Sequence, residues 1–206
     1  MLSQAEEAPK VILFTSGWRG EGKTATAINT AIVFAQMEAK VLVIDADLRR
    51  SACHNRLCLE NTTGLSELLT GQRTLEEVIK PTLMTDNLFV ITGGAVPPDP
   101  AKLVGSRKMY DVLACLREQF DYIFIDSPPL LPVSDALRLS TMVDGVVLVA
   151  KAQETTRDVL KDACYRLRFA QATVLGVVLN QVDMNNGDYG YYHSDIYRTT
   201  ASPEAT

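Results

Sequence analysis

The sequence predicts an α/β fold: a doubly wound, mostly parallel central sheet with helices on both faces. Short β-branched runs alternate along the chain with longer amphipathic runs, which is the order of elements that builds such a sheet. The short runs are apolar throughout, as in strands that are buried on both faces. With 206 residues, the chain has the size of one ordinary domain, and no repeat or linker divides it.

The elements follow one another in a regular order. Apolar runs predict strands at residues 11–15, 41–45, 88–91, 122–126, 146–150 and 175–179. Amphipathic runs between them predict helices at residues 23–37, 65–69, 75–79, 102–119, 134–142 and 155–170. The first helix is rich in alanine and can lie close to the sheet, while the prolines within residues 97–100 predict a loop. The pattern stops after Asn180, so we expect one domain over residues 1–183 and a mobile, tyrosine-rich tail over residues 184–206.

Composition and charge exclude several classes of protein. The 20 basic and 25 acidic residues give a net charge of −5, which argues against nucleic acid as a partner. No apolar run approaches the roughly 20 residues of a membrane-spanning helix, and the first residues do not resemble a signal peptide. Cys53, His54 and Cys58 lie close in sequence, but no second ligand pair accompanies them. We therefore expect the reduced thiols of a soluble, cytoplasmic protein rather than a metal site.

A glycine-rich segment between the first strand and the first helix fits the pattern G-x-x-x-x-G-K-S/T. Its glycines allow a tight turn whose N–H groups face phosphate oxygens, and the helix adds the positive end of its dipole. Lys23 would supply a charge to the outer phosphates, and the Thr24 hydroxyl can ligate Mg²⁺. The segment predicts a P-loop NTPase fold and a nucleotide site formed by Gly17, Trp18, Arg19, Gly20, Glu21, Gly22, Lys23, Thr24 and Ala25.

Three aspartates stand at the ends of two predicted strands. Asp45 and Asp47 end the second strand and would point to the same side if the chain stayed extended, and Asp126 ends the fourth. The carboxyl ends of parallel strands line the crevice where ligands bind in such sheets. Three carboxylates gathered there would raise one another's pKa unless a cation lay among them. Mg²⁺ bound to nucleotide phosphates is such a cation.

These motifs together resemble those of the bacterial tyrosine kinases (BY-kinases) of capsule and exopolysaccharide systems. Residues 20–24, 45–49 and 125–129 are similar to the Walker A, Walker A′ and Walker B motifs of that family, and residues 94–103 are similar to one of its loops. The resemblance runs from residue 10 to about residue 183. A tyrosine-rich C-terminus is a second hallmark, and the last eighteen residues contain Tyr189, Tyr191, Tyr192 and Tyr197.

The resemblance implies an ATP- and Mg²⁺-dependent protein-tyrosine autokinase that regulates polysaccharide synthesis or export. It would phosphorylate the tail tyrosines in trans, between subunits of a homo-oligomer. By the same analogy Asp45 would take the proton of the attacking tyrosine, and Asp47 and Asp126 would organise Mg²⁺ with Thr24. Asn180 would contact the adenine edge. The implied partners are a transmembrane activator, or a fused membrane segment, and a tyrosine phosphatase, which would place the kinase at the inner face of the membrane.

The sequence departs from the kinase pattern at two points and from the pattern of related ATPases at a third. Arg19 stands where the kinases commonly have proline. Trp18 stands where the related partition and septum-positioning ATPases have a signature lysine, and this departure counts against that ATPase class. The E-x-x-R-x-x-R motif that the family uses to build rings is missing before residue 11, so we expect a fragment of a longer protein or a late start. A partition-type ATPase switch without kinase activity is one alternative. A GTPase is another, because residues 180–183 are similar to the N-K-x-D guanine motif.

Overall fold

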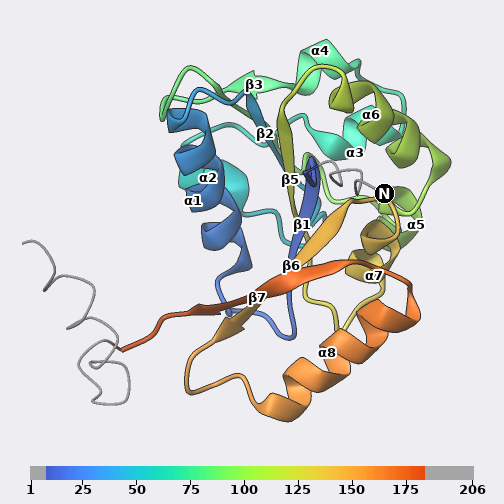
Figure 1. Cartoon of the computed structure of the whole chain (residues 1–206). Coiled ribbons are helices and arrows are strands. Elements are labelled where there is room, and N and C mark those ends of the chain that lie inside the picture. The colour runs from blue at the N-terminus through green and yellow to red at the C-terminus, as the bar shows by residue number, and fades with distance from the viewer. Residues whose placement is uncertain (1–7, 184–206) are drawn as a thin grey trace, which may run out of the picture.

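A computed structural model describes residues 8–183 and contains one seven-stranded sheet between two layers of helices (Figure 1). The strand order is β3-β4-β2-β5-β1-β6-β7, and all neighbours are parallel except the pair β3 and β4. The strands are β1 (Val11–Ser16), β2 (Val41–Asp45), β3 (Lys80–Pro81), β4 (Leu88–Ile91), β5 (Tyr122–Asp126), β6 (Gly145–Lys151) and β7 (Val174–Asn180). The helices are α1 (Lys23–Gln36), α2 (Cys53–Leu57), α3 (Leu65–Leu69), α4 (Leu75–Val78), α5 (Pro100–Val104), α6 (Arg107–Arg117), α7 (Asp135–Ser140) and α8 (Arg157–Phe169). The predicted doubly wound, mostly parallel α/β fold is confirmed.

The helices cover both faces of the sheet, and each face has its own apolar core. On one face, Ala27 of α1 and Leu57 of α2 pack with Phe14 of β1. On the other face, α3 to α8 cover a larger core that includes Leu13 of β1 and Leu116 of α6. Figure 1 shows α1 and α2 on one side of the strands and α5 to α8 on the other. The small side chain of Ala27 is completely buried, in agreement with the close packing expected of the alanine-rich helix.

Three neighbouring strands bring the sequence motifs to one edge of the sheet. β5 lies between β2 and β1, and Asp126 of β5 is the register partner of Asp45 on one side and of Phe14 on the other. Because the three strands are parallel, their carboxyl ends meet at the same edge, where β1 leads through residues 17–22 into α1. Open α/β sheets bind their ligands at this edge.

Some local structure differs from the sequence prediction. The short elements α2 and β3 were not predicted, and the helix expected at residues 102–119 is divided into α5 and α6. α5 ends at Val104 with Gly105 as its C-cap, and the hydroxyl of Ser106 accepts a hydrogen bond from the backbone N–H of Met109 as the N-cap of α6. None of the helices within residues 8–183 is long and apolar enough to cross a membrane. The predicted tail with its four tyrosines lies outside the described residues.

Candidate functional site

The glycine-rich loop between β1 and α1 has the backbone geometry that anion binding requires. Gly20 and Gly22 have φ values of 91° and 97°, in the left-handed region that side chains disfavour. Gly22 is also the N-cap of α1, and no side chain within residues 8–183 caps this helix end. The first N–H groups of α1 and the positive end of its dipole are therefore available to an anion. Trp18 and Arg19 are exposed in this loop, and Ala25 is half-buried in the first turn of α1.

Side chains from two distant parts of the chain brace this loop. Glu21 is buried, and one of its carboxylate oxygens accepts the backbone N–H of Trp18 at 2.8 Å. The hydroxyl of Thr155, which lies between β6 and α8, donates to the other oxygen. Asn180, the last residue of β7, donates from Nδ2 to the carbonyl oxygen of Glu21 at 3.0 Å. A Cβ atom on Gly22 would lie 1.8 Å from the same Nδ2, so glycine leaves the space that this contact needs.

Lys23 lies between two of the aspartates. Its Nζ is 3.4 Å from Oδ2 of Asp47 and 3.9 Å from Oδ1 of Asp126. The Thr24 hydroxyl donates a hydrogen bond to Oδ2 of Asp126 at 2.6 Å. Asp126 is completely buried, and within residues 8–183 its Oδ1 accepts no hydrogen bond. Asp45 is also buried and its charge acts on Asp126, so three carboxyl groups gather near one lysine, and a bound cation would offset their charge.

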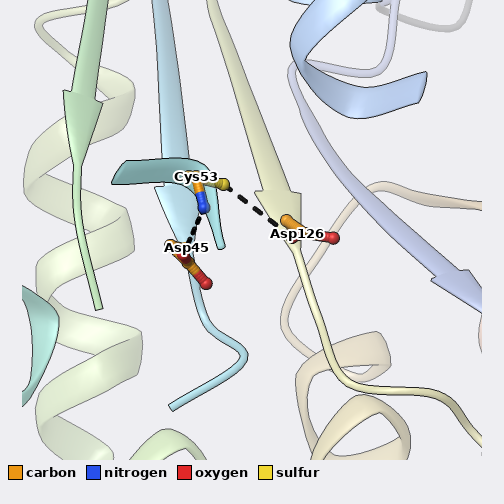
Figure 2. Close-up of side chains that lie close together, drawn as sticks. All are labelled: Asp45, Cys53 and Asp126. Carbon is orange, nitrogen blue, oxygen red and sulfur yellow. Dashed lines mark hydrogen bonds between the residues drawn. The ribbon is translucent and has the colours of Figure 1, made fainter. Parts of the chain in front are cut away.

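Asp45 is held by the segment that follows its own strand. Its Oδ2 accepts three hydrogen bonds, from the Ser51 hydroxyl at 2.6 Å and from the backbone N–H groups of Ala52 and Cys53 at 2.9 Å each. The other oxygen, Oδ1, accepts the backbone N–H of Asp47 at 3.2 Å. β2 ends at Asp45, so Asp47 lies two residues beyond the strand. Figure 2 shows the hydrogen bond from the backbone N–H of Cys53 to Asp45 and the contact of the Cys53 sulfur with Asp126.

Burial raises the pKa of two of these carboxyl groups. The pKa of Asp126 is raised to about 7, chiefly by burial, against the lowering effect of the Lys23 charge; the charges of Asp45 and Asp47 raise it further. The pKa of Asp47 is also raised by burial and lowered in part by Lys23. The direction agrees with the sequence prediction, but burial contributes more than the repulsion between carboxylates. A cation beside Asp126 would favour its ionised form.

The polar groups at this edge fit a magnesium-bound nucleotide. Mg²⁺ prefers oxygen ligands and usually takes one or two carboxylates together with phosphate oxygens and waters. The Thr24 hydroxyl and the Asp126 carboxylate lie side by side at the start of α1, and Asp126 Oδ1 has no hydrogen-bond donor within residues 8–183. Phosphate groups on the loop would meet the N–H groups of α1 and the Lys23 ammonium group.

Sequence reasoning missed several residues that support this site. Thr155 contacts Glu21 from 134 positions away, and no sequence pattern marks it. Ser51 and Cys53 hold Asp45, and the Cys53 thiol also lies 3.8 Å from Oδ2 of Asp126. Their closeness in sequence to Asp45 was the available signal.

Comparison with known proteins relates this chain to nucleotide-binding enzymes. A family model described as an AAA domain matches residues 9–174. The chain is 37% identical over 184 residues to the tyrosine-protein kinase YwqD of Bacillus subtilis, covering 89% of this chain and 77% of that protein. The kinase domain of the Escherichia coli tyrosine kinase ETK matches with a TM-score of 0.82 and 32% identity, covering 96% of this chain and 71% of that one. The septum site-determining protein MinD of Pyrococcus horikoshii, complexed with Mg-ADP, matches with a TM-score of 0.71 and 26% identity, covering 82% and 69%.

Proposed function

The chain belongs to the family of bacterial tyrosine-protein kinases built on a P-loop AAA domain, and we propose that it transfers the terminal phosphoryl group of Mg²⁺-bound ATP to tyrosines of its own tail. The acceptors would be Tyr189, Tyr191, Tyr192 and Tyr197 of a neighbouring copy. The observation that carries this proposal is the meeting of Lys23 with buried carboxylates beside an uncapped helix N-terminus.

The residues of the loop would bind and orient the phosphates. Backbone N–H groups of residues 17–25 would hold the phosphate oxygens, and Lys23 would neutralise charge on the group being transferred. Thr24 and Asp126 would hold Mg²⁺ directly and Asp47 would act through its waters. When bound, the ion would balance the charge on the phosphates and on the carboxylates around it. Catalysis of this kind depends on position and electrostatics, and no covalent enzyme intermediate is required.

Asp45 is the proposed acceptor of the tyrosine proton. Three donors already occupy its Oδ2, so the proton would go to Oδ1, whose one hydrogen bond, from Asp47 N–H, is long at 3.2 Å. Ser51 and the N–H groups of Ala52 and Cys53 would fix the orientation of the carboxylate. Asn180 would position the adenine ring of ATP, because the Asn180 side chain lies against the loop at Glu21.

The likeness to MinD supports a second candidate, a nucleotide-driven assembly switch that hydrolyses ATP and phosphorylates no protein.

For the proposed kinase, family resemblance further supports a role in polysaccharide synthesis or export at the inner face of the membrane. A transmembrane activator would stimulate the kinase, and a phosphatase would reverse its action. Each phosphotyrosine adds about −1.5 to −2 charges to an acidic chain, so phosphorylation would weaken association between copies.

A mixing experiment separates these possibilities. The donor carries phenylalanine at all four tail tyrosines, and the acceptor keeps the tyrosines but carries Lys23→Met. Incubation with Mg-ATP, followed by phosphopeptide mapping, should show labelled acceptor tails only in the mixture. A donor made with Lys161→Met, at an exposed lysine of α8, serves as the matched control and should label equally well.

Each outcome of the mixing experiment is informative. Labelling of the unaltered chain at a rate independent of its concentration, with no labelling in the mixture, would show transfer within one copy. Release of free phosphate with no modified tail peptide would favour the assembly switch and refute the kinase proposal.

A further inference from the structure

Cys53 lies inside the acidic site, although the proposed phosphoryl transfer gives its sulfur no role. It is the first residue of α2 and is completely buried, and its Sγ faces Oδ2 of Asp126 at 3.8 Å. One carboxylate oxygen of Asp45, one of Asp126 and the Sγ atom all lie within 4.8 Å of one another. Within residues 8–183 this is the only group of three such side chains that comes so close. Figure 2 shows the three converging from the ends of β2 and β5 and the start of α2.

We propose that Asp45, Cys53 and Asp126 form a binding site for a thiophilic divalent cation of the Zn²⁺ class. Zn²⁺ accepts thiolate together with carboxylate ligands in tetrahedral geometry, whereas Mg²⁺ requires oxygen ligands. Bond lengths of about 2.0 to 2.3 Å place the donors of a tetrahedral site roughly 3.5 Å apart. The distance of 3.8 Å from Cys53 Sγ to Asp126 Oδ2 approaches this value, and the Asp45 oxygen, within 4.8 Å of both partners, would have to move closer.

One oxygen of each carboxyl group has free capacity, whereas Oδ2 of Asp126, the oxygen that faces the sulfur, already accepts the Thr24 hydroxyl. Within residues 8–183, Oδ1 of buried Asp126 accepts no hydrogen bond, and Oδ1 of Asp45 accepts only the N–H of Asp47, at 3.2 Å. On binding, the Cys53 thiol would release its proton to solvent as the sulfur–metal bond forms. The two carboxylates and the thiolate then carry three negative charges; the cation offsets two of them, and Lys23, which also pairs with Asp47, lies beside Asp126.

A cation bound at this site would inhibit the magnesium-dependent phosphoryl transfer; this expected inhibition rests on the proposed function. Asp126 serves both sites, and its Oδ2 now accepts the Thr24 hydroxyl at 2.6 Å. A ligand bond to the soft cation would draw this carboxylate from Thr24 towards Cys53. The site would therefore make the chain sensitive to zinc through a sulfur atom that phosphoryl transfer does not need.

Cobalt binding tests the site directly and without reference to catalysis. One equivalent of Co²⁺ added to the reduced, nucleotide-free chain should produce a thiolate-to-cobalt charge-transfer band in the near ultraviolet, and Zn²⁺ should remove it. Cys53→Ala, which keeps the backbone N–H to Asp45, should abolish the band and weaken Zn²⁺ binding at least about tenfold, because even outer partners of metal ligands contribute that much. Cys58→Ser, at the exposed end of α2, is the matched control and should keep both.

The outcomes separate this proposal from the kinase assignment. Absence of the band in the unaltered chain, its survival in Cys53→Ala, or its loss in Cys58→Ser would overturn the metal site. Thermal unfolding of Cys53→Ala checks that the variant is folded, and Cys53→Ser provides a second variant at the same position. Zn²⁺ should also inhibit tail labelling at least about tenfold more strongly in the unaltered chain than in Cys53→Ala. A chain that binds cobalt through Cys53 but labels no tyrosine would retain the metal site and refute only the kinase.

Discussion

Replacing Asp126 by asparagine should stabilise the nucleotide-free chain against unfolding at neutral and alkaline pH. Burial raises the pKa of this carboxyl group from its ordinary value of 3.8 to about 7. In the unfolded chain the group is therefore ionised above about pH 4, whereas in the folded chain it keeps its proton until about pH 7. The folded state binds the extra proton between these values, so its stability falls as pH rises from about 4 to 7.

The size of this effect follows from the two pKa values. Their difference of about three pH units corresponds to about 4 kcal/mol in the free energy of unfolding, since each unit is worth about 1.4 kcal/mol. Asparagine has nearly the same shape and carries no charge at any pH, so the variant avoids this cost. The attraction of the charged form to Lys23 is already contained in the pKa of about 7. We expect Asp126→Asn to be more stable than the unaltered chain by about 2 to 4 kcal/mol at pH 8, and by much less at pH 5.

Urea denaturation at pH 5 and pH 8, without nucleotide, measures the difference. Asp111→Asn is the matched control, because Asp111 is exposed and pairs with Arg107 on the surface of α6; its stability should follow that of the unaltered chain. Mg-ADP should reduce the stability difference between Asp126→Asn and the unaltered chain at pH 8, since it binds and stabilises only the chain that keeps Asp126. The reasoning would be refuted if Asp126→Asn and the unaltered chain lost the same stability between the two pH values.

Two further predictions concern the glycine-rich loop. Gly22→Ala should weaken ADP binding much more than Gly20→Ala, because both positions have positive φ but only the Cβ at Gly22 would displace Asn180. Gly20→Ala should cost about 1 kcal/mol of binding free energy, which is about fivefold in affinity for ADP. Equal losses of affinity in calorimetric titrations of the two variants would contradict this account. Thr155→Val removes the hydroxyl that contacts buried Glu21. The loss of this hydrogen bond, about 1 to 2 kcal/mol, should weaken ADP binding about tenfold, while Thr155→Ser should bind ADP normally. Equal affinities of the two variants for ADP would show that this contact does not brace the loop.

The sequence was sufficient to place the aspartates because their strands are buried on both faces. Continuous apolar runs that end in an acidic residue fix where each strand stops, and parallel pairing brings those ends to one edge. Asp45 and Asp126 are accordingly direct register partners on β2 and β5. The glycine-rich pattern likewise predicted the turn, which the positive φ values of Gly20 and Gly22 confirm.

Contacts between distant segments could not be predicted in the same way. Glu21 reads in the sequence as one variable position of the loop, yet its carboxylate is buried between Trp18 and Thr155. α2 is a helix of five residues and is too short to show a helical period, so the burial of Cys53 against Asp126 was not predicted. Such contacts depend on side-chain direction after the chain has folded, which local patterns do not encode.

The hydrogen bond between Asn180 and the glycine-rich loop limits how far the proposed acceptor tyrosines can reach. Tyr189 follows Asp183 by six positions, and a fully stretched chain of that length spans at most roughly 20 Å. Tyr197 follows by fourteen positions and can extend to roughly 50 Å. By chain length alone, the proposed acceptor Tyr189 has the shortest possible reach from the loop, and Tyr197 has the longest reach towards a second molecule. Modification between molecules should therefore begin at the distal end and proceed inward.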